Sequence, residues 1–271
     1  MKKSVAFLTA VLPLSCCALE VAPWFGEVWE FNLYSDYTYY RFNHVQDGHP
    51  AVKHPWNNQL LTFALEVPPK NYYDLEIEIE FAETPKQSWG FRSFAGQFRF
   101  LFLDDVAGDP VSLMAGANIR GVSHHSLRDV SCPYHSDVNF ELNGAVGKEW
   151  SQMQYWRLRT FAFLGAGIAN HGSLWLRALV ACEGNHLDRH RYKVFANSYW
   201  GFGPDRAVNI DHFHGYAKIH HQSIDLGAGY SYVFDLWGSL GFTYAFRIYA
   251  QSFPEYVNFF SLTYSLPFSF F

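Results

Sequence analysis

The chain ends in a long stretch, residues 236–271, in which large apolar side chains alternate with small or polar ones. The apolar series is Leu240, Phe242, Tyr244, Phe246 and Ile248 and, after a break at residues 253–255, Phe260, Leu262, Tyr264, Leu266, Phe268 and Phe270. A period of two over ten or more residues is typical of a β-strand whose two faces meet different environments. Strands of about 9 to 11 residues are long enough to cross a bilayer when they are tilted.

This final amphipathic strand ends in an aromatic residue and resembles the C-terminal signature of Gram-negative outer-membrane β-barrel proteins. Phe270 shares the apolar face, whereas Phe271 lies one step out of register. The resemblance is to an architectural class, and it names no activity. It implies an outer-membrane location, contact with the lipid bilayer and lipopolysaccharide, and recognition of the last strand by the outer-membrane insertion machinery.

Residues 1–18 have the composition of a secretory signal peptide. Two lysines precede an apolar run, and small residues follow, so cleavage is expected after Ala18. A lipoprotein site at Cys16 is the weaker alternative, because Pro13 stands where such a site prefers an aliphatic residue. We therefore expect residues 19–271 to form a single outer-membrane barrel.

Similar alternation recurs along the chain and predicts twelve strands. These are residues 28–42, 58–67, 72–83, 89–103, 111–121, 138–148, 153–168, 174–183, 191–201, 214–232, 236–251 and 256–271. The connections on one side are short, and three on the other side are long, as bacterial barrels require. The prediction is an all-β, antiparallel transmembrane barrel of about twelve strands with both termini on the periplasmic side.

Alternation alone does not say which face points inward. A soluble sandwich or a lipocalin-like barrel would cover its outward polar face with lysine, yet only six lysines follow the signal peptide. Small residues and scattered charges suit a crowded interior better. We therefore expect the apolar face to point to lipid and the polar face to line the lumen, the interior of the barrel.

The polar face carries charge. In the strand predicted over residues 72–83, three acids alternate with apolar residues: Glu76, Glu78 and Glu80. The expected cationic partners are Arg99, Arg120, Arg157, Arg159, Arg177 and Arg247. Because an unpaired buried charge is costly, these groups should pair across the lumen. Opposed charged walls fit the constriction of a small-solute channel, or equally an ion-pair network that fills the barrel of a structural surface protein.

Histidine is concentrated in or beside the predicted external connections. These histidines are His44, His49, His54, His124, His125, His135, His171, His212 and His214. His212 and His214 are weak candidates for a shared metal, because residues two apart on an extended segment face the same way. Ordinary polar loop histidines are the alternative, and the sequence indicates no cofactor.

The His124-His125-Ser126 segment carries the one catalytic hypothesis. Outer-membrane phospholipases and lipid A deacylases are similar in placing a His-x-Ser pair on a barrel strand, where the imidazole takes the hydroxyl proton. In this chain the pair would be His124 and Ser126, with Asn139 or Glu141 as the group that orients the imidazole. Extrapolated alternation places the pair on the lumen side, whereas a nucleophile that cuts lipid should face lipid. A lipid hydrolase is therefore the alternative to a channel or surface protein.

The remaining composition excludes other classes. The formal net charge of −5 speaks against a nucleic-acid partner. Cys132 and Cys182 are too few for a disulfide scaffold, and their predicted positions at opposite ends of the barrel exclude a bond between them.

Overall fold

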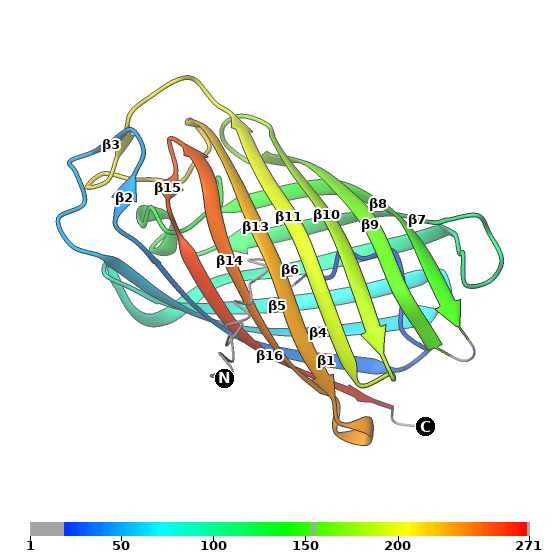
Figure 1. Cartoon of the computed structure of the whole chain (residues 1–271). Helices are drawn as coiled ribbons and strands as arrows, with labels where there is room; N and C mark the ends of the chain where they lie inside the picture. Colours follow the sequence, from blue (N-terminus) through cyan, green and yellow to red (C-terminus); the bar gives the residue numbers. More distant parts are fainter. Residues whose placement is uncertain (1–18, 153–154, 270–271) are drawn as a thin grey trace, which may run out of the picture.

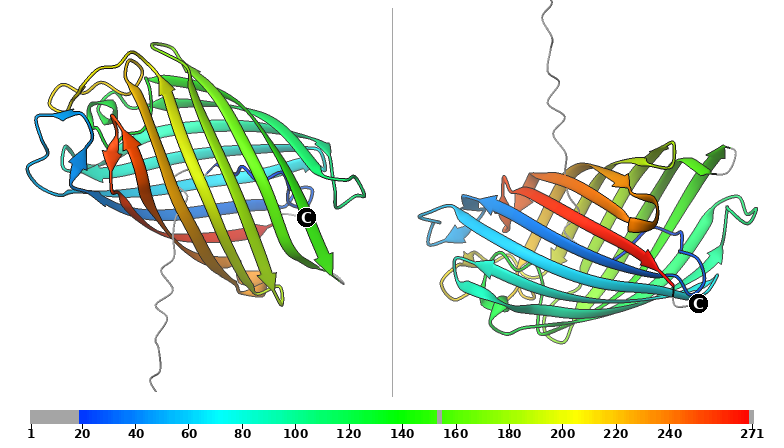
Figure 2. Two further views of the ribbon diagram at one scale, coloured as in Figure 1. Left: turned by 45° about the horizontal axis from the view of Figure 1, so that its top comes forward. Right: turned by 90° about the horizontal axis from the view of Figure 1, so that it is seen from below.

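The computed structural model describes residues 19–152 and 155–269. Twelve long strands close into one antiparallel barrel (Figure 1), and the closure is visible from two further directions (Figure 2). The strands are β1 (Phe31–Phe42), β4 (Trp56–Lys70), β5 (Tyr73–Thr84), β6 (Gln87–Leu103), β7 (Ser112–Val122), β8 (Val138–Gln152), β9 (Tyr155–Ala169), β10 (Trp175–His186), β11 (His190–Phe202), β13 (His220–Val233), β14 (Ser239–Gln251) and β16 (Asn258–Phe268). The predicted signal peptide, residues 1–18, lies outside the described residues, as do Phe270 and Phe271.

Each long strand pairs with its neighbour in the chain, and β1 closes the barrel against β16, from Phe31 opposite Phe268 to Arg41 opposite Asn258. The prediction of twelve antiparallel strands is confirmed. Three strands begin three residues or more after their predicted starts: β1 at Phe31, β13 at His220 and β14 at Ser239. Glycines with positive φ, Gly215 and Gly238, interrupt the extended chain before the last two of these strands.

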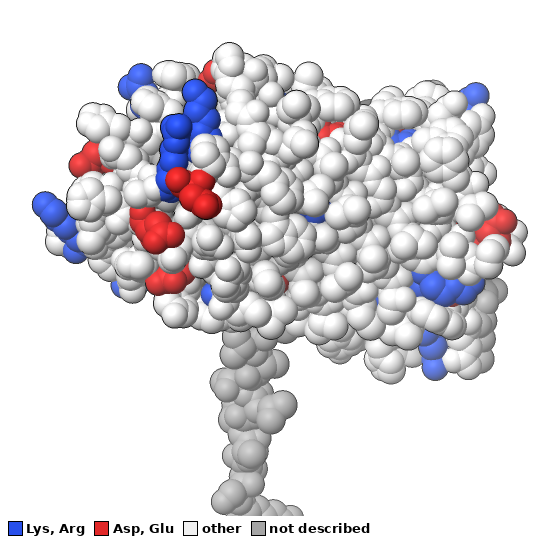
Figure 3. Space-filling model, turned by 90° about the horizontal axis from the view of Figure 1, so that it is seen from above, with Lys and Arg blue, Asp and Glu red and all other residues white. Residues whose placement is uncertain are grey.

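The side chains of each strand alternate between the lumen and the outer wall. On β5, Leu75 and Ile77 point outward and are 44% and 50% exposed. Glu76 and Glu78, each of which follows one of them in the chain, are 1% exposed. Figure 3 shows that charged side chains gather at the two ends of the barrel and that the visible wall between them is largely uncharged. This wall matches the apolar band of a transmembrane barrel. In the described residues, no helix is long and apolar enough to span a membrane.

The two ends of the barrel differ. We call the end where β1 begins and β16 ends the terminal end, and the opposite end the loop end. At the loop end, residues 43–55, 123–137 and 203–219 form long connections that fold over one another (Figure 1). They contain β3 (Gly48–His49), paired with β12 (Val208–Asn209), and the 3-10 helix η1 (Ser126–Arg128). They also contain β2 (His44–Val45), which pairs with β15 (Pro254–Glu255) in the connection between β14 and β16. The other 3-10 helix, η2 (Asp235–Trp237), lies in a connection at the terminal end.

Cys132 and Cys182, the two cysteines among the described residues, are free. Cys132 is buried in the connection between β7 and β8, and Cys182 lies within β10, where it pairs with Thr160 and Val194 along the backbone. The expectation that they form no disulfide is confirmed.

A charge on the outer wall tests the assignment of that wall to lipid. Leu164, which is 56% exposed, lies near the middle of β9 opposite Gly144 and Ala178. Leu164→Arg should lower the free energy of unfolding in lipid vesicles by about 2–4 kcal/mol, because arginine is costly at the bilayer midplane. Val106→Arg is the control: Val106 is 62% exposed but lies in a terminal-end turn, so the change should be within about 1 kcal/mol. Equal losses in denaturant titrations would contradict the assignment.

Candidate functional site

One wall of the lumen is acidic. Asp74, Glu76, Glu78 and Glu80 occupy alternate positions of β5, so all four side chains point inward, and each is 3% exposed or less. Glu66 of the neighbouring β4 is equally buried. The period of two in the strand therefore concentrates five carboxyl groups on one side of the barrel.

Two buried arginines pair with this acidic wall. Arg99 of β6 lies 2.6 Å from Asp74, its backbone partner across the two strands, and 2.7 Å from Glu66. Arg120 of β7 lies 2.5 Å from Glu78 and 3.3 Å from Glu80. Short contacts of this kind are needed to offset the free-energy cost of removing the charges from water.

The opposite side of the lumen carries two further pairs. Arg177 of β10 donates to Glu141 of β8 at 2.9 Å, and Arg247 of β14 donates to Asp225 of β13 at 2.6 Å. Between these pairs and Arg120 lies a central cavity of about 100 Å³. This small cavity lies in the loop-end half of the lumen, beneath the connections, and charges of both signs border it.

Two of the predicted lumen arginines lie outside these two charged walls. Arg159 forms an ion pair with Glu149 at 2.7 Å toward the terminal end. Arg157 is exposed at the start of β9 and is not part of either charged wall. Sequence reasoning missed Glu66, Asp74 and Asp225, although alternation with outward neighbours marks Glu66 and Asp74. It marks Asp225 as well, because the register shift beside it leaves out Ile248 of β14, while on β13 Ser223 and Asp225 are buried and Leu226 is 46% exposed.

The N-terminal segment, residues 19–30, runs inside the barrel before β1 begins. The main-chain N–H of Glu20 donates to Glu76 at 2.9 Å, and Gln97 donates to the Glu20 carbonyl at 2.8 Å. Arg99 donates to the Ala22 carbonyl at 3.1 Å. The segment thus satisfies charged and polar groups of the acidic wall. Nothing in its sequence is periodic, so alternation did not reveal this position.

Trp24 fixes the other end of this segment. Its indole N–H donates to Asp105 at 3.0 Å, and its ring meets Phe161 edge-on with centroids 5.8 Å apart. The Arg159 guanidinium lies 4.8 Å from the centre of the Trp24 ring. A side chain at Gly147 would come within 2.7 Å of the Trp24 ring, so glycine leaves the space that this indole fills.

The lumen changes in width along its axis. Toward the terminal end, two cavities of about 790 Å³ and about 860 Å³ border the N-terminal segment and share Trp24, Trp156, Arg159 and Arg191 among their lining residues. The central cavity is about 100 Å³. The terminal end is therefore a wide vestibule that narrows at the charged walls.

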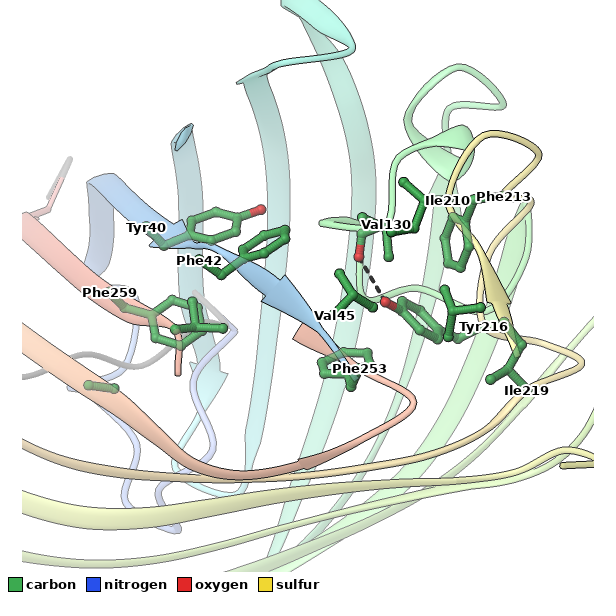
Figure 4. Close-up of a cluster of buried hydrophobic side chains, with 13 residues drawn as sticks. Tyr40, Phe42, Val45, Val130, Ile210, Phe213, Tyr216, Ile219, Phe253 and Phe259 are labelled. Atoms are coloured by element: carbon green, nitrogen blue, oxygen red, sulfur yellow. Dashed lines mark hydrogen bonds between the residues drawn. The ribbon is translucent and has the colours of Figure 1, made fainter. Parts of the chain in front are cut away.

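An apolar cluster fills the loop end (Figure 4). The cluster joins strand residues to residues of the long connections: Tyr40, Phe42, Val45, Val130, Val208, Ile210, Phe213, Tyr216, Ile219, Ala245, Phe253, Val257 and Phe259. The Tyr216 hydroxyl donates to the Val130 carbonyl at 2.8 Å, the bond drawn in Figure 4. Burial of this apolar surface holds the connections inward over the charged part of the lumen.

Two histidines belong to this packed region rather than to a solvated loop. His135 and His221 are fully buried, with ring centroids 5.1 Å apart. Burial, together with His221, lowers the pKa of His135 well below its usual range, so this imidazole is neutral at pH 7. His212 and His214 are exposed, and the ring stacked near His214 is that of His124. In the part of the chain that is described, no group of three or more His, Cys, Asp or Glu side chains is placed to hold a metal ion.

The structure does not assemble the catalytic pair. Ser126 lies in η1 rather than on an extended strand, is buried, and donates to Gln87 at 3.0 Å. His124 is exposed and lies 3.7 Å from Asp137. The extrapolated alternation failed because β7 ends at Val122.

The two residues expected to orient the imidazole have other partners. Asn139 accepts hydrogen bonds from the main-chain N–H groups of His135 and Ser136, and Glu141 pairs with Arg177.

Comparison with known proteins gives a fold but no family. No protein-family model and no curated protein sequence matches the chain. Among solved structures, the barrel is similar to the COG4313 outer membrane channel from Pseudomonas putida F1, with a TM-score of 0.66, 8% identity, and coverage of 91% of this chain and 98% of that one. It is also similar to the KdgM porin, with a TM-score of 0.51, 9% identity, and coverage of 87% and 99%. The fold is that of an outer-membrane β-barrel. At such identities the likeness concerns the fold alone.

The bond between Trp24 and the turn after β6 makes a pH-dependent prediction. Partial burial raises the pKa of Asp105, but hydrogen bonds from Ser112, the Glu149 main chain and Trp24 outweigh it, so the pKa is lowered. The pKa of Asp105 is thus lower in the folded protein than in the unfolded chain, where an aspartate has a pKa of about 3.9, so the ionised carboxylate stabilises the fold at higher pH. This stability is lost as the pH falls through the pKa that Asp105 has in the folded protein. Asp105→Asn should therefore cost about 1 kcal/mol or more at pH 7, the scale of a hydrogen bond to a charged group.

The same comparison at acidic pH is the control. Below the folded pKa of Asp105 the two proteins should have nearly equal free energies of unfolding, because the native carboxyl is then neutral like the amide. A difference that is the same at pH 7 and in acid would contradict the role of the Asp105 charge.

Proposed function

We propose that this protein is a narrow outer-membrane channel for small polar solutes, whose charged central lumen selects among ions and whose terminal end opens to the periplasm. The observation that carries the proposal is the central cavity of about 100 Å³, bordered by Arg120, Arg177 and Arg247 with their acidic partners. It lies between a wide vestibule and the folded connections. Rings of charge at a constriction are the usual basis of ion selectivity in a pore.

The proposal extends to orientation and partners. Short turns at the terminal end and long connections at the loop end match the periplasmic and external sides of bacterial barrels. The exposed histidines, such as His44, His54 and His212, would then face outward among lipopolysaccharide head groups. The last strand, β16, is the segment that we expect the insertion machinery to recognise. Similarity in fold to a channel and to a porin supports this proposal. Ser126 is buried and donates to Gln87, whereas His124 is exposed, which favours a channel over lipid hydrolysis.

Planar-bilayer recording of the refolded protein tests the proposal. We expect small conductance steps, and Arg177→Gln should make the pore more selective for cations because Glu141 loses its partner. A unit charge acting over about 4 Å in a water-filled lumen contributes about 1 kcal/mol, so the permeability ratio should change about fivefold. Arg206→Gln, in an exposed connection at the loop end, is the matched control and should leave the ratio unchanged.

Absence of conductance would instead support a structural surface protein with a filled lumen. Fatty-acid release from phospholipid or lipid A by the purified protein, abolished by Ser126→Ala, would support the hydrolase and contradict the proposed channel.

A further inference from the structure

The acidic wall has more carboxyl groups than buried cationic partners. With Glu20 of the N-terminal segment, six carboxyls gather there. In the described residues, three buried arginines face them: Arg92, Arg99 and Arg120. Lys193 influences Glu20, but it is paired with Glu183 at 2.9 Å. A further positive charge would therefore lower the free energy of this wall.

Glu78 is the acid whose partners are least complete. It is 1% exposed, and neither of its carboxylate oxygens has a hydrogen bond of good geometry. Its charged neighbour Arg120 is shared with Glu80 and also donates to the Ser93 hydroxyl at 2.7 Å. A buried carboxylate that shares its arginine with a second acid can accept a further cationic donor.

The start of the N-terminal segment lies beside this carboxylate, because the Glu20 N–H donates to Glu76, which stands two residues before Glu78 on the same inward face of β5. The main-chain N–H of Leu19 interacts with Glu78, and the next N–H along the chain, that of Glu20, already donates to Glu76. Leu19 itself is buried, with 4% of its surface exposed, and it also lines the central cavity. An amide N–H can donate one hydrogen bond to this carboxylate and carries no charge.

We propose that cleavage of the bond between Ala18 and Leu19 creates an α-ammonium group that binds Glu78 and completes the charge balance of the lumen. A signal peptidase would supply the hydrolysis: water adds its oxygen to the Ala18 carbonyl carbon, and the Leu19 nitrogen leaves with the proton. At neutral pH the new amine is protonated, so Glu78 gains a positive partner with three N–H donors. The N-terminal segment is then held at both ends, by Glu78 deep in the lumen and by Asp105 through Trp24.

This proposal rests on the predicted cleavage site and does not depend on whether the barrel conducts. Its first test is the intact mass of the protein secreted with its own signal sequence. We expect a mature chain that begins at Leu19. A different first residue would overturn the proposal.

A thermodynamic cycle tests the contact itself. The barrel is produced with a removable leader, so that it begins either at Leu19 or with one extra glycine, which displaces the ammonium group by one residue. Both chains are made with Glu78 and with Glu78→Gln, and their unfolding equilibria are measured in vesicles. The extra glycine should shift the unfolding constant by about tenfold or more when Glu78 is present, since it leaves a buried acid without its partner. With Glu78→Gln the shift should be less than about twofold, and equal shifts would overturn the proposal.

Amine reactivity provides a measurement on the unmodified sequence, in case Glu78→Gln fails to fold. The α-amine of the chain that begins at Leu19 is dimethylated by formaldehyde and a hydride donor, and the labelled N-terminal peptide is quantified by mass spectrometry. Labelling should be at least about tenfold slower in the folded barrel than in urea, the protection expected of a buried, paired group. Equal rates in the folded and unfolded protein would overturn the proposal.

Discussion

The cost of burying charge inside a closed barrel is the constraint on which the rest of this structure depends. The strand period that turns Leu75 and Ile77 toward lipid necessarily turns Glu76 and Glu78 inward, away from the bulk solvent. Such charges remain ionised only if cationic groups stand within a few ångströms. The backbone register provides this for Asp74 opposite Arg99, and other pairs form across neighbouring strands.

The same constraint explains why the lumen contains chain as well as side chains. Main-chain groups of Glu20 and Ala22 bind Glu76, Gln97 and Arg99, so the N-terminal segment supplies partners that the strands lack. The segment also covers an inward apolar surface on the other wall, which includes Phe161, Phe163 and Phe195 together with Val21. One short segment thus meets a polar wall on one side and an apolar wall on the other.

The sequence predicted the barrel well because alternation is a local property of each strand. Twelve strands, the outward apolar face and the inward position of Glu76, Glu78 and Glu80 all follow from it. The extended position expected of Ser126 was wrong, because β7 ends at Val122 and Ser126 lies in η1. The inward phenylalanines Phe161 and Phe163 were equally beyond prediction, since they face the N-terminal segment, whose path has no periodic signal.

The shape of the lumen links these contacts to the proposed function. Solute entering the vestibule would meet the N-terminal segment, then the charged walls, and then the apolar cluster around Tyr216 and Phe253. Passage along this route requires movement of packed connections, so we expect a channel of low conductance rather than a wide pore. The contact between the connections is close at Gly215, where any larger side chain would meet the His135 carbonyl at 2.4 Å.

The central claim is that the N-terminal segment lies inside the barrel as part of the buried charge network. Hydrogen exchange of the amides of Glu20, Val21 and Ala22 in the folded protein, read out by mass spectrometry of the N-terminal peptide, tests this most directly. Their N–H groups bind Glu76 and the Glu20 carboxylate, so exchange should be slowed to the level of the barrel strands. Exchange as fast as that of an unstructured peptide would contradict the account.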